Sequence, residues 1–178
     1  MTPSAWGGAR AGAGRPAKGP IASEPHKARP HLAARHPVHV TARVVRGLGG
    51  LRHRRAYRAI ERAIETSLAR SDFRIVHLAL RRTYVELIVE ADDKVALARG
   101  MQGFQVAAAR YLNGVASRRG TVFPDRYRAR ILTSRQAVRD AVSQLPARSE
   151  PPAAWPITWL LRVELAPQLR RARPRAPG

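Results

Sequence analysis

The chain has 178 residues, the size of one ordinary domain with tails, and it contains no cysteine. Its formal net charge is +21, from 33 Lys and Arg against 12 Asp and Glu. Without cysteine the sequence has no disulfide, no thiolate zinc site and no thiol nucleophile. The charge indicates a polyanionic partner. No apolar run approaches the roughly 18 residues of a membrane span and no apolar signal core opens the chain, so we expect a cytoplasmic protein without membrane contact.

Composition divides the chain into three parts. Residues 1–37 are Gly, Ala, Pro and basic residues without periodicity, which predicts a disordered basic tail. Residues 38–146 are predicted to form an α+β domain, and 147–178 a C-terminal extension that ends in a second basic tail. Because residues 38–144 still carry 21 Lys and Arg against nine acids, the basic charge belongs to the domain as well as to the tails.

The first predicted elements are a strand and a helix. The β-branched run 38–45 predicts a strand that ends at the glycine-rich turn 47–50. Apolar residues then recur every three or four positions over 52–69, which predicts an amphipathic helix. Its apolar face comprises Tyr57, Ile60, Ile64 and Leu68. Its polar face comprises Arg54, Arg55, Arg58 and Arg62, which suits either phosphate contact or a solvated surface.

The remaining elements complete a recognisable order. Two apolar runs, 73–80 and 84–91, predict an antiparallel hairpin with a basic tip at 81–83. Asp92 or Asp93 can cap a long helix whose apolar residues continue to Val115. A strand over 122–132 and a helix over 134–145 follow. This order predicts a ferredoxin-like antiparallel sheet with helices packed on one of its faces.

Several segments together resemble a known family. They are the runs 37–41 (PVHVT), 73–77 (FRIVH), 87–91 (LIVEA), 97–102 (LARGMQ), 121–127 (TVFPDRY) and 133–135 (TSR). In this order and spacing they resemble the HUH-type single-tyrosine transposases of small insertion sequences, in particular the REP-associated branch. The resemblance covers about residues 36–146. It implies a DNA-binding protein that is associated with DNA transposition.

The resemblance also implies a catalytic site, at positions where this chain differs. In the family two strand histidines bind a divalent metal, and a helical tyrosine attacks the scissile phosphate of single-stranded DNA. Here Tyr84 and Glu86 occupy the histidine positions, and Gln144 occupies the tyrosine position. We therefore expect degenerate catalytic positions and no bound cofactor. If activity is retained, Mg²⁺ could bind weakly through Glu86, with His39 or His77 assisting.

Clustered arginines are the candidate DNA contacts. Arg126, Arg128 and Arg130 alternate along the predicted strand, which places their guanidinium groups on one face, with Tyr127 on the other. The predicted nucleic-acid-binding set is Arg81, Arg82, Arg118, Arg119, Arg126, Arg128 and Arg130. A solvated face is the alternative. Residues 12–18 (GAGRPAK) also resemble the core of an AT-hook, although Gly/Pro/Arg tails often produce such strings.

Four interpretations remain open from the sequence. The chain is a DNA-binding protein with lost catalysis, a still-active transposase that nicks single-stranded DNA, a repurposed DNA- or RNA-binding regulator, or an inert paralogue. The expected partner is single-stranded or hairpin DNA, with a homodimer as a further possibility. The segment 155–161 (WPITWLL) either covers the core or forms a dimer contact.

Overall fold

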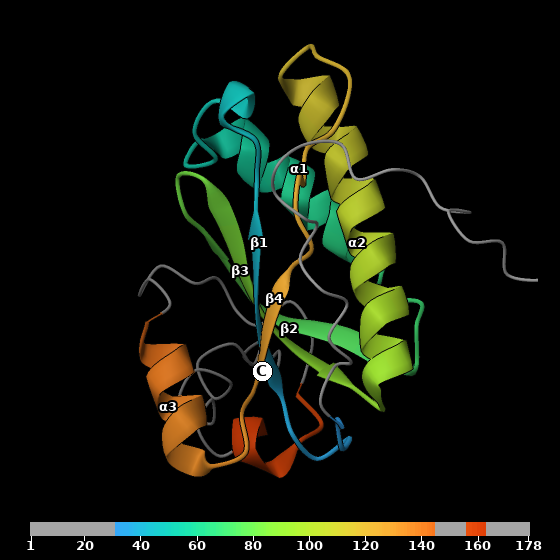
Figure 1. Ribbon diagram of the computed structural model, residues 1–178, viewed down its shortest axis with the longest axis vertical. Helices are drawn as coiled ribbons and strands as arrows, with labels where there is room; N and C mark the ends of the chain where they lie inside the picture. Colours follow the sequence, from blue (N-terminus) through green and yellow to red (C-terminus); the bar gives the residue numbers. More distant parts are fainter. Residues whose placement is uncertain (1–30, 145–155, 163–178) are drawn as a thin grey trace, which may run out of the picture.

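A computed structural model of the protein describes residues 31–144 and 156–162. Within them the elements are β1 (Val38–Arg43), η1 (Arg46–Leu48), α1 (Arg54–Glu65), β2 (Phe73–Leu80), β3 (Tyr84–Ala91), α2 (Lys94–Val115), β4 (Arg128–Ile131) and α3 (Arg135–Ser143). The strands form one antiparallel sheet in the order β2-β3-β1-β4 (Figure 1). The predicted ferredoxin-like α+β fold is therefore confirmed.

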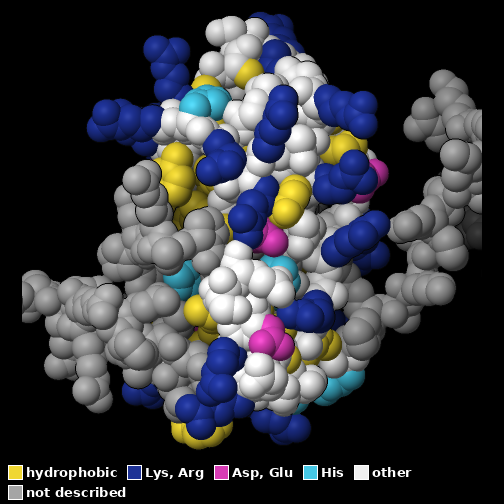
Figure 2. Space-filling model, turned by 90° about the vertical axis from the view of Figure 1, so that its left-hand side faces the viewer, with side chains coloured by type: hydrophobic (Ala, Val, Ile, Leu, Met, Phe, Trp, Pro, Cys, Tyr) yellow, Lys and Arg dark blue, Asp and Glu magenta, His cyan; other side chains and the backbone are white. Residues whose placement is uncertain are grey.

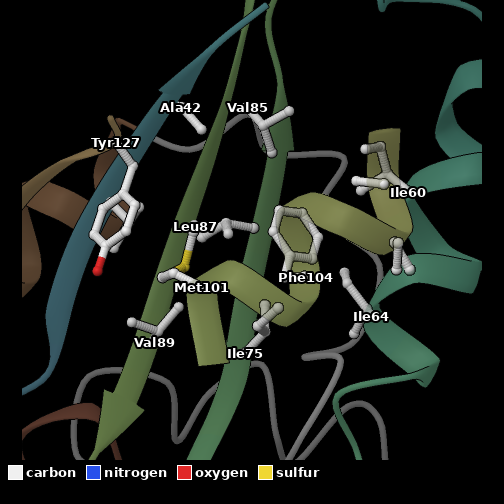
Figure 3. Close-up of a cluster of buried hydrophobic side chains, with 14 of the residues drawn as sticks. Ala42, Ile60, Ile64, Ile75, Val85, Leu87, Val89, Met101, Phe104 and Tyr127 are labelled. Atoms are coloured by element: carbon white, nitrogen blue, oxygen red, sulfur yellow. The ribbon is translucent and has the colours of Figure 1, made fainter. Parts of the chain in front are cut away.

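Alternate residues of the strands build the main core. Val38, Val40 and Ala42 of β1 point to the side that α1 and α2 cover, together with the odd-numbered valines and leucine of β3. Met101 and Phe104 of α2 fill the space above them, and Ile60 and Ile64 of α1 close it (Figure 3). Apolar residues alternate along these strands and recur every three or four positions along these helices, so the apolar faces of both pack together in this core.

The opposite face of the sheet is also covered, in part, which differs from the predicted single helical layer. The helix α3 lies on that side of the sheet (Figure 1), and a second core cluster forms beneath it. This cluster comprises Val76, Ala79, Ile88, Leu132, Val138, Ala141 and Leu161. The prediction was wrong because β2 and β3 carry apolar residues on both faces, and a strand buried on both sides needs two covering layers.

Helix α1 is shorter than the predicted span 52–69. Its N-cap is His53, whose side chain accepts a hydrogen bond from the amide of Ala56 at 3.2 Å. At the other end the hydroxyls of Thr66 and Ser67 each donate to a carbonyl three residues earlier at 2.7 Å. Hydroxyls that satisfy the last carbonyls in this way favour a turn over another helical turn. Leu68 therefore lies outside the helix and is 53% exposed, so its predicted core position was wrong.

The last strand is also shorter than predicted. Only 128–131 pair with β1, whereas 122–127 run irregularly past the end of that strand. Pro124 has no N–H for a sheet ladder, and the amide of Val45 instead donates to the carbonyl of Val122 at 2.9 Å. Arg126 is therefore in a loop and does not belong to the predicted strand ladder, while Tyr127 turns into the core.

The predicted hairpin and long helix are confirmed, with Asp93 as the cap of α2. Its carboxylate accepts from the amides of Val95 and Ala96, both at 2.7 Å, and these bonds lower its pKa. The structure differs from the predicted tail at 31–37, because Leu32 is buried in the main core. The AT-hook-like run 12–18 and most of both tails lie outside the described residues. None of the helices in the described part has the length and apolarity to cross a membrane.

Candidate nucleic-acid interface

The face of the sheet that α3 covers only in part carries two cross-strand rows of chemically active side chains. Residues directly opposite in an antiparallel sheet point to the same face. The first row, from β2 to β4, is Ala79, Glu86, Thr41 and Arg128. The second is His77, Ile88, His39 and Arg130. The sheet thus brings Glu86 and both candidate histidines to one face, a register that the sequence alone does not fix.

Glu86 lies at the centre of a small polar cluster. Arg81, at the start of the β2–β3 turn, donates its Nε to Glu86 Oε2 at 2.7 Å. The same guanidinium donates its Nη2 to the backbone carbonyl of Gln144, the C-cap of α3. His39 Nε2 lies 3.8 Å from Glu86 Oε1. The hydrogen bond to Glu86 raises the pKa of Arg81, so this arginine stays charged. Arg81 therefore links Glu86 to Gln144, the two positions at which the resemblance implies a metal ligand and a nucleophile.

These residues do not fit the divalent metal that the resemblance implies. One Glu86 oxygen is already held by a permanently charged guanidinium, which would repel a dication at the same place. The other donor within reach is a single imidazole, His39, and Tyr84 offers a phenol where the family has a histidine. Among the described residues no group of three or more His, Cys, Asp and Glu is positioned to hold a metal ion. The cluster is built as an ion pair.

Three exposed arginines lie near this cluster, on the half of the face that no described helix covers, which we call the open half. Arg128 and Arg130 extend from the edge strand β4, and Arg43 ends β1 opposite Tyr84. None of the three forms an ion pair with any other described residue. Figure 2 views the molecule from the side that carries α3 and shows many Lys and Arg side chains around few acidic ones. We call Arg43, Arg128 and Arg130 the sheet-face arginines.

Arg43 was not among the predicted contacts, although the sequence contains a signal for it. Along β1 the residues His39, Thr41 and Arg43 alternate with the buried Val38, Val40 and Ala42, which places them on the face of Glu86. The alternation of residues over 38–43 is therefore sufficient to predict that Arg43 lies on this face.

The other predicted arginines lie elsewhere. Arg82 is exposed at the hairpin tip, and its carbonyl accepts from the amide of Leu51 at 3.1 Å. Arg118 donates to the carbonyl of Thr121 at 3.2 Å, and the neighbouring Arg119 is exposed in the same loop. Arg126 lines a separate hollow of about 360 Å³ between α2 and 120–127. The structure thus places Arg81, Arg128 and Arg130 around Glu86, and the remaining four in the hairpin tip and the loop after α2.

The far end of the same face is sealed by the C-terminal segment. Glu90 is 4% exposed and accepts hydrogen bonds from the amides of Ile157 and Thr158 and from the hydroxyl of Thr158, at 2.7–3.0 Å. Leu161 is buried in the cluster beneath α3. Segment 156–162 therefore covers core, as one of the two interpretations of 155–161 expected. Ile157 and Trp159 are nevertheless exposed, and Trp155 lies outside the described residues.

His39 gives the cluster a measurable pH dependence. Burial lowers the pKa of His39 below 6.5; the Glu86 carboxylate opposes this shift and Arg130 adds to it. The folded state thus binds a proton on His39 less readily than the unfolded state does. The stabilisation is complete above pH 6.5 and is lost as the pH falls from there through the folded pKa.

We therefore expect a shallower fall of stability between pH 7 and pH 5 in His39→Gln than in the wild type. Urea unfolding at several pH values measures the slope. The exposed His31→Gln controls for removal of a histidine. Equal slopes in His39→Gln and wild type would contradict the assignment.

Comparisons with known proteins found a similar solved structure, and no matching family model or curated protein. Among solved structures, a protein from Deinococcus radiodurans R1 described as a "putative transposase" is similar, with a TM-score of 0.43 and 18% identity. The match covers 69% of this chain and 94% of that one. Identity this low leaves the functional inference to the side chains described above.

Proposed function

We propose that the protein binds single-stranded or hairpin DNA through the open half of its sheet face. The observation that supports this most directly is the set of three sheet-face arginines, which have no ion-pair partner among the described residues. Glu86, whose side chain is in the same cross-strand row as Arg128, is already paired with Arg81. The surface charge is therefore free to meet phosphate oxygens, and guanidinium groups on a rigid strand suit them.

A single strand fits this surface better than an undistorted duplex. Helix α3 and the segment 156–162 cover part of the face, which leaves less of the sheet for a rigid duplex to lie against. Tyr84, half-buried beside Arg43, offers an aromatic surface for an unstacked base. Basic tracks that combine cations with aromatic rings are typical of proteins that bind single strands with little sequence preference.

In this proposal the chain is a transposase-like protein of the HUH single-tyrosine type. Its catalytic positions are occupied by residues that form structural contacts instead of a metal site and a nucleophile. Arg81 stands between the positions that would hold metal and nucleophile and binds both of them. No tyrosine follows Tyr127 in the sequence, so the tyrosine that the resemblance implies on the last helix is missing. The sheet-face arginines lie around these positions.

The first test removes two sheet-face arginines. Arg128→Gln with Arg130→Gln is expected to weaken binding of a hairpin with a single-stranded flank about tenfold, because each exposed ionic contact contributes up to about 1 kcal/mol. The slope of log K against log salt should fall by about 1.4, since each single-strand phosphate contact contributes about 0.7. Fluorescence anisotropy between 25 and 200 mM NaCl measures both.

Matched arms of the same experiment separate the rival functions. Lys94→Gln removes one charge at the start of α2 and should leave binding within about twofold. An RNA strand of the same sequence that binds tighter than DNA would favour a regulator of RNA. A covalent protein–DNA adduct formed with Mg²⁺ or Mn²⁺ would establish an active transposase and overturn the structural role of Arg81. Undiminished affinity in the double variant would overturn the sheet-face interface.

A further inference from the structure

A second basic surface lies on the other side of the sheet, along the seam between α1 and α2. One hollow of about 200 Å³ is lined by α1 residues 55–62 and α2 residues 111–115. Another of about 620 Å³ follows, lined by residues 66–70 after α1 and by α2 residues 99–110. The two helices therefore run antiparallel, and the hollows lie in sequence along one seam. We call them together the helix groove.

The charge of the helix groove is of one sign. Its lining includes Arg55, Arg58, Arg62, Arg70, Arg99 and Arg110. Neither hollow is lined by an Asp or a Glu among the described residues. Arg70 binds Asp72 through Nη2 at 2.7 Å, but its Nε is buried and has no hydrogen-bond partner in the described part of the chain. A ligand oxygen at the rim of this cationic hollow would satisfy that donor.

An aromatic ring lies where the two hollows meet. Tyr111 lines the smaller hollow, and Arg110 lines the larger one. The guanidinium of Arg110 lies 5.0 Å from the centre of the Tyr111 ring, and its Nη2 donates to the phenol oxygen at 3.2 Å. The arginine thus fixes the ring in place. The ring packs partly against the core, and its exposed part lies within the row of arginines. Aromatic rings beside phosphate-binding cations are the pairing that single-strand binders use.

The floor of the larger hollow leaves room for a ligand. Gly100 and Gly103 line it, and a side chain at Gly103 would meet no atom within 4 Å. Val106, also in the lining, is 67% exposed. From Arg55 to Arg70 the groove is on the order of 20 Å long, which suits about four nucleotides. An acidic peptide would meet the same charges but gains nothing specific from the ring.

We propose that the helix groove binds a second segment of single-stranded nucleic acid, so that one chain holds two segments on opposite sides of its sheet. The groove shares no lining residue with the sheet face. Binding in the helix groove is additional to the proposed function and independent of binding on the sheet face.

The test uses the full-length chain carrying Arg128→Gln and Arg130→Gln, so that the sheet face contributes little. In this background Gly103→Glu places a carboxylate in the groove and Gly103→Ala places only a methyl group there. We expect Gly103→Glu to weaken binding of a twelve-residue oligo-dT at least fivefold and Gly103→Ala to leave it unchanged. Because either side chain has open space and improves helix propensity, thermal unfolding should show both variants folded.

A second pair of variants tests the ring. Tyr111→Phe keeps the stacking surface and should bind within about twofold, whereas Tyr111→Leu should bind about tenfold more weakly. Equal binding by Gly103→Glu and Gly103→Ala would overturn the proposal. The proposal would also be overturned if oligoglutamate binds in the groove while the affinity for oligo-dT is the same in the Gly103 variants as in their parent. If Gly103→Glu weakens binding but the sheet-face pair has no effect in the wild-type background, the sheet-face proposal fails and this one holds.

Discussion

Replacing Glu90 with alanine is expected to lower the free energy of unfolding by about 3 kcal/mol and to release segment 156–162 from the sheet. The Glu90 carboxylate is buried and accepts from two amides and one hydroxyl of Ile157 and Thr158. It also lies 3.7 Å from Arg74 Nε. Alanine removes every one of these acceptors, and buried donors left without partners each cost about 1–3 kcal/mol. The same change opens the cover over Leu161.

Two measurements check this release. Urea unfolding gives the loss of stability, and hydrogen exchange at the Thr158 amide reports whether the segment has detached. Glu90→Gln keeps one carbonyl oxygen as an acceptor and should lose less than half as much stability as Glu90→Ala. Glu65→Ala, at an exposed position at the end of α1, should change stability by less than about 0.5 kcal/mol. Full protection of the Thr158 amide in Glu90→Ala would show that the segment is held by other contacts.

Glu90 also shows that the sequence of a strand does not predict which segment covers it. The alternation of residues along β3 is enough to place Glu86 and Glu90 on one face, because side-chain direction follows from local backbone geometry. It does not reveal what covers that face. The partners of Glu90 are 67 and 68 residues further along the chain, in a segment whose apolar residues suit a cover or a dimer contact equally well.

Element types were predictable and element ends were not. The hairpin 73–91 and the long helix after Asp93 carry clear periodicities and appear as predicted. The end of α1 depends instead on two hydroxyl groups that satisfy carbonyls, and the start of β4 depends on Pro124. Such ends depend on individual hydrogen-bonding groups, which the pattern of hydrophobic residues does not report.

The candidate interface was predicted in its residue types and only partly in its geometry. Arg128 and Arg130 share a face with Glu86, as their spacing allowed. The contact between Arg81 and Gln144 spans 63 residues and depends on how α3 docks, which no local signal encodes. The ion pair between Arg81 and Glu86 and its link to Gln144 therefore emerge only from the tertiary structure.

Replacing Arg81 with alanine tests that ion pair directly. We expect the free energy of unfolding to fall by about 2 kcal/mol, a value reduced from that of a fully buried pair because a third of the Arg81 side chain is exposed. The loss arises because Glu86, which is 8% exposed, loses its hydrogen-bonded partner in a buried environment. The C-terminal end of α3 also loses the donor to the Gln144 carbonyl.

A double-mutant cycle distinguishes this ion pair from a general loss of packing. Glu86→Gln in the Arg81→Ala background removes the stranded charge and should recover part of the stability, whereas independent effects would add. The pH dependence should change as well. With Arg81 gone, the Glu86 charge acts on His39 alone and raises the pKa of His39, so less stability is lost as the pH falls below 6.5. If Arg81→Ala unfolds at the same urea concentration as the wild type, Arg81 has no structural role and is free to bind phosphate itself, which would place the DNA path directly over Glu86.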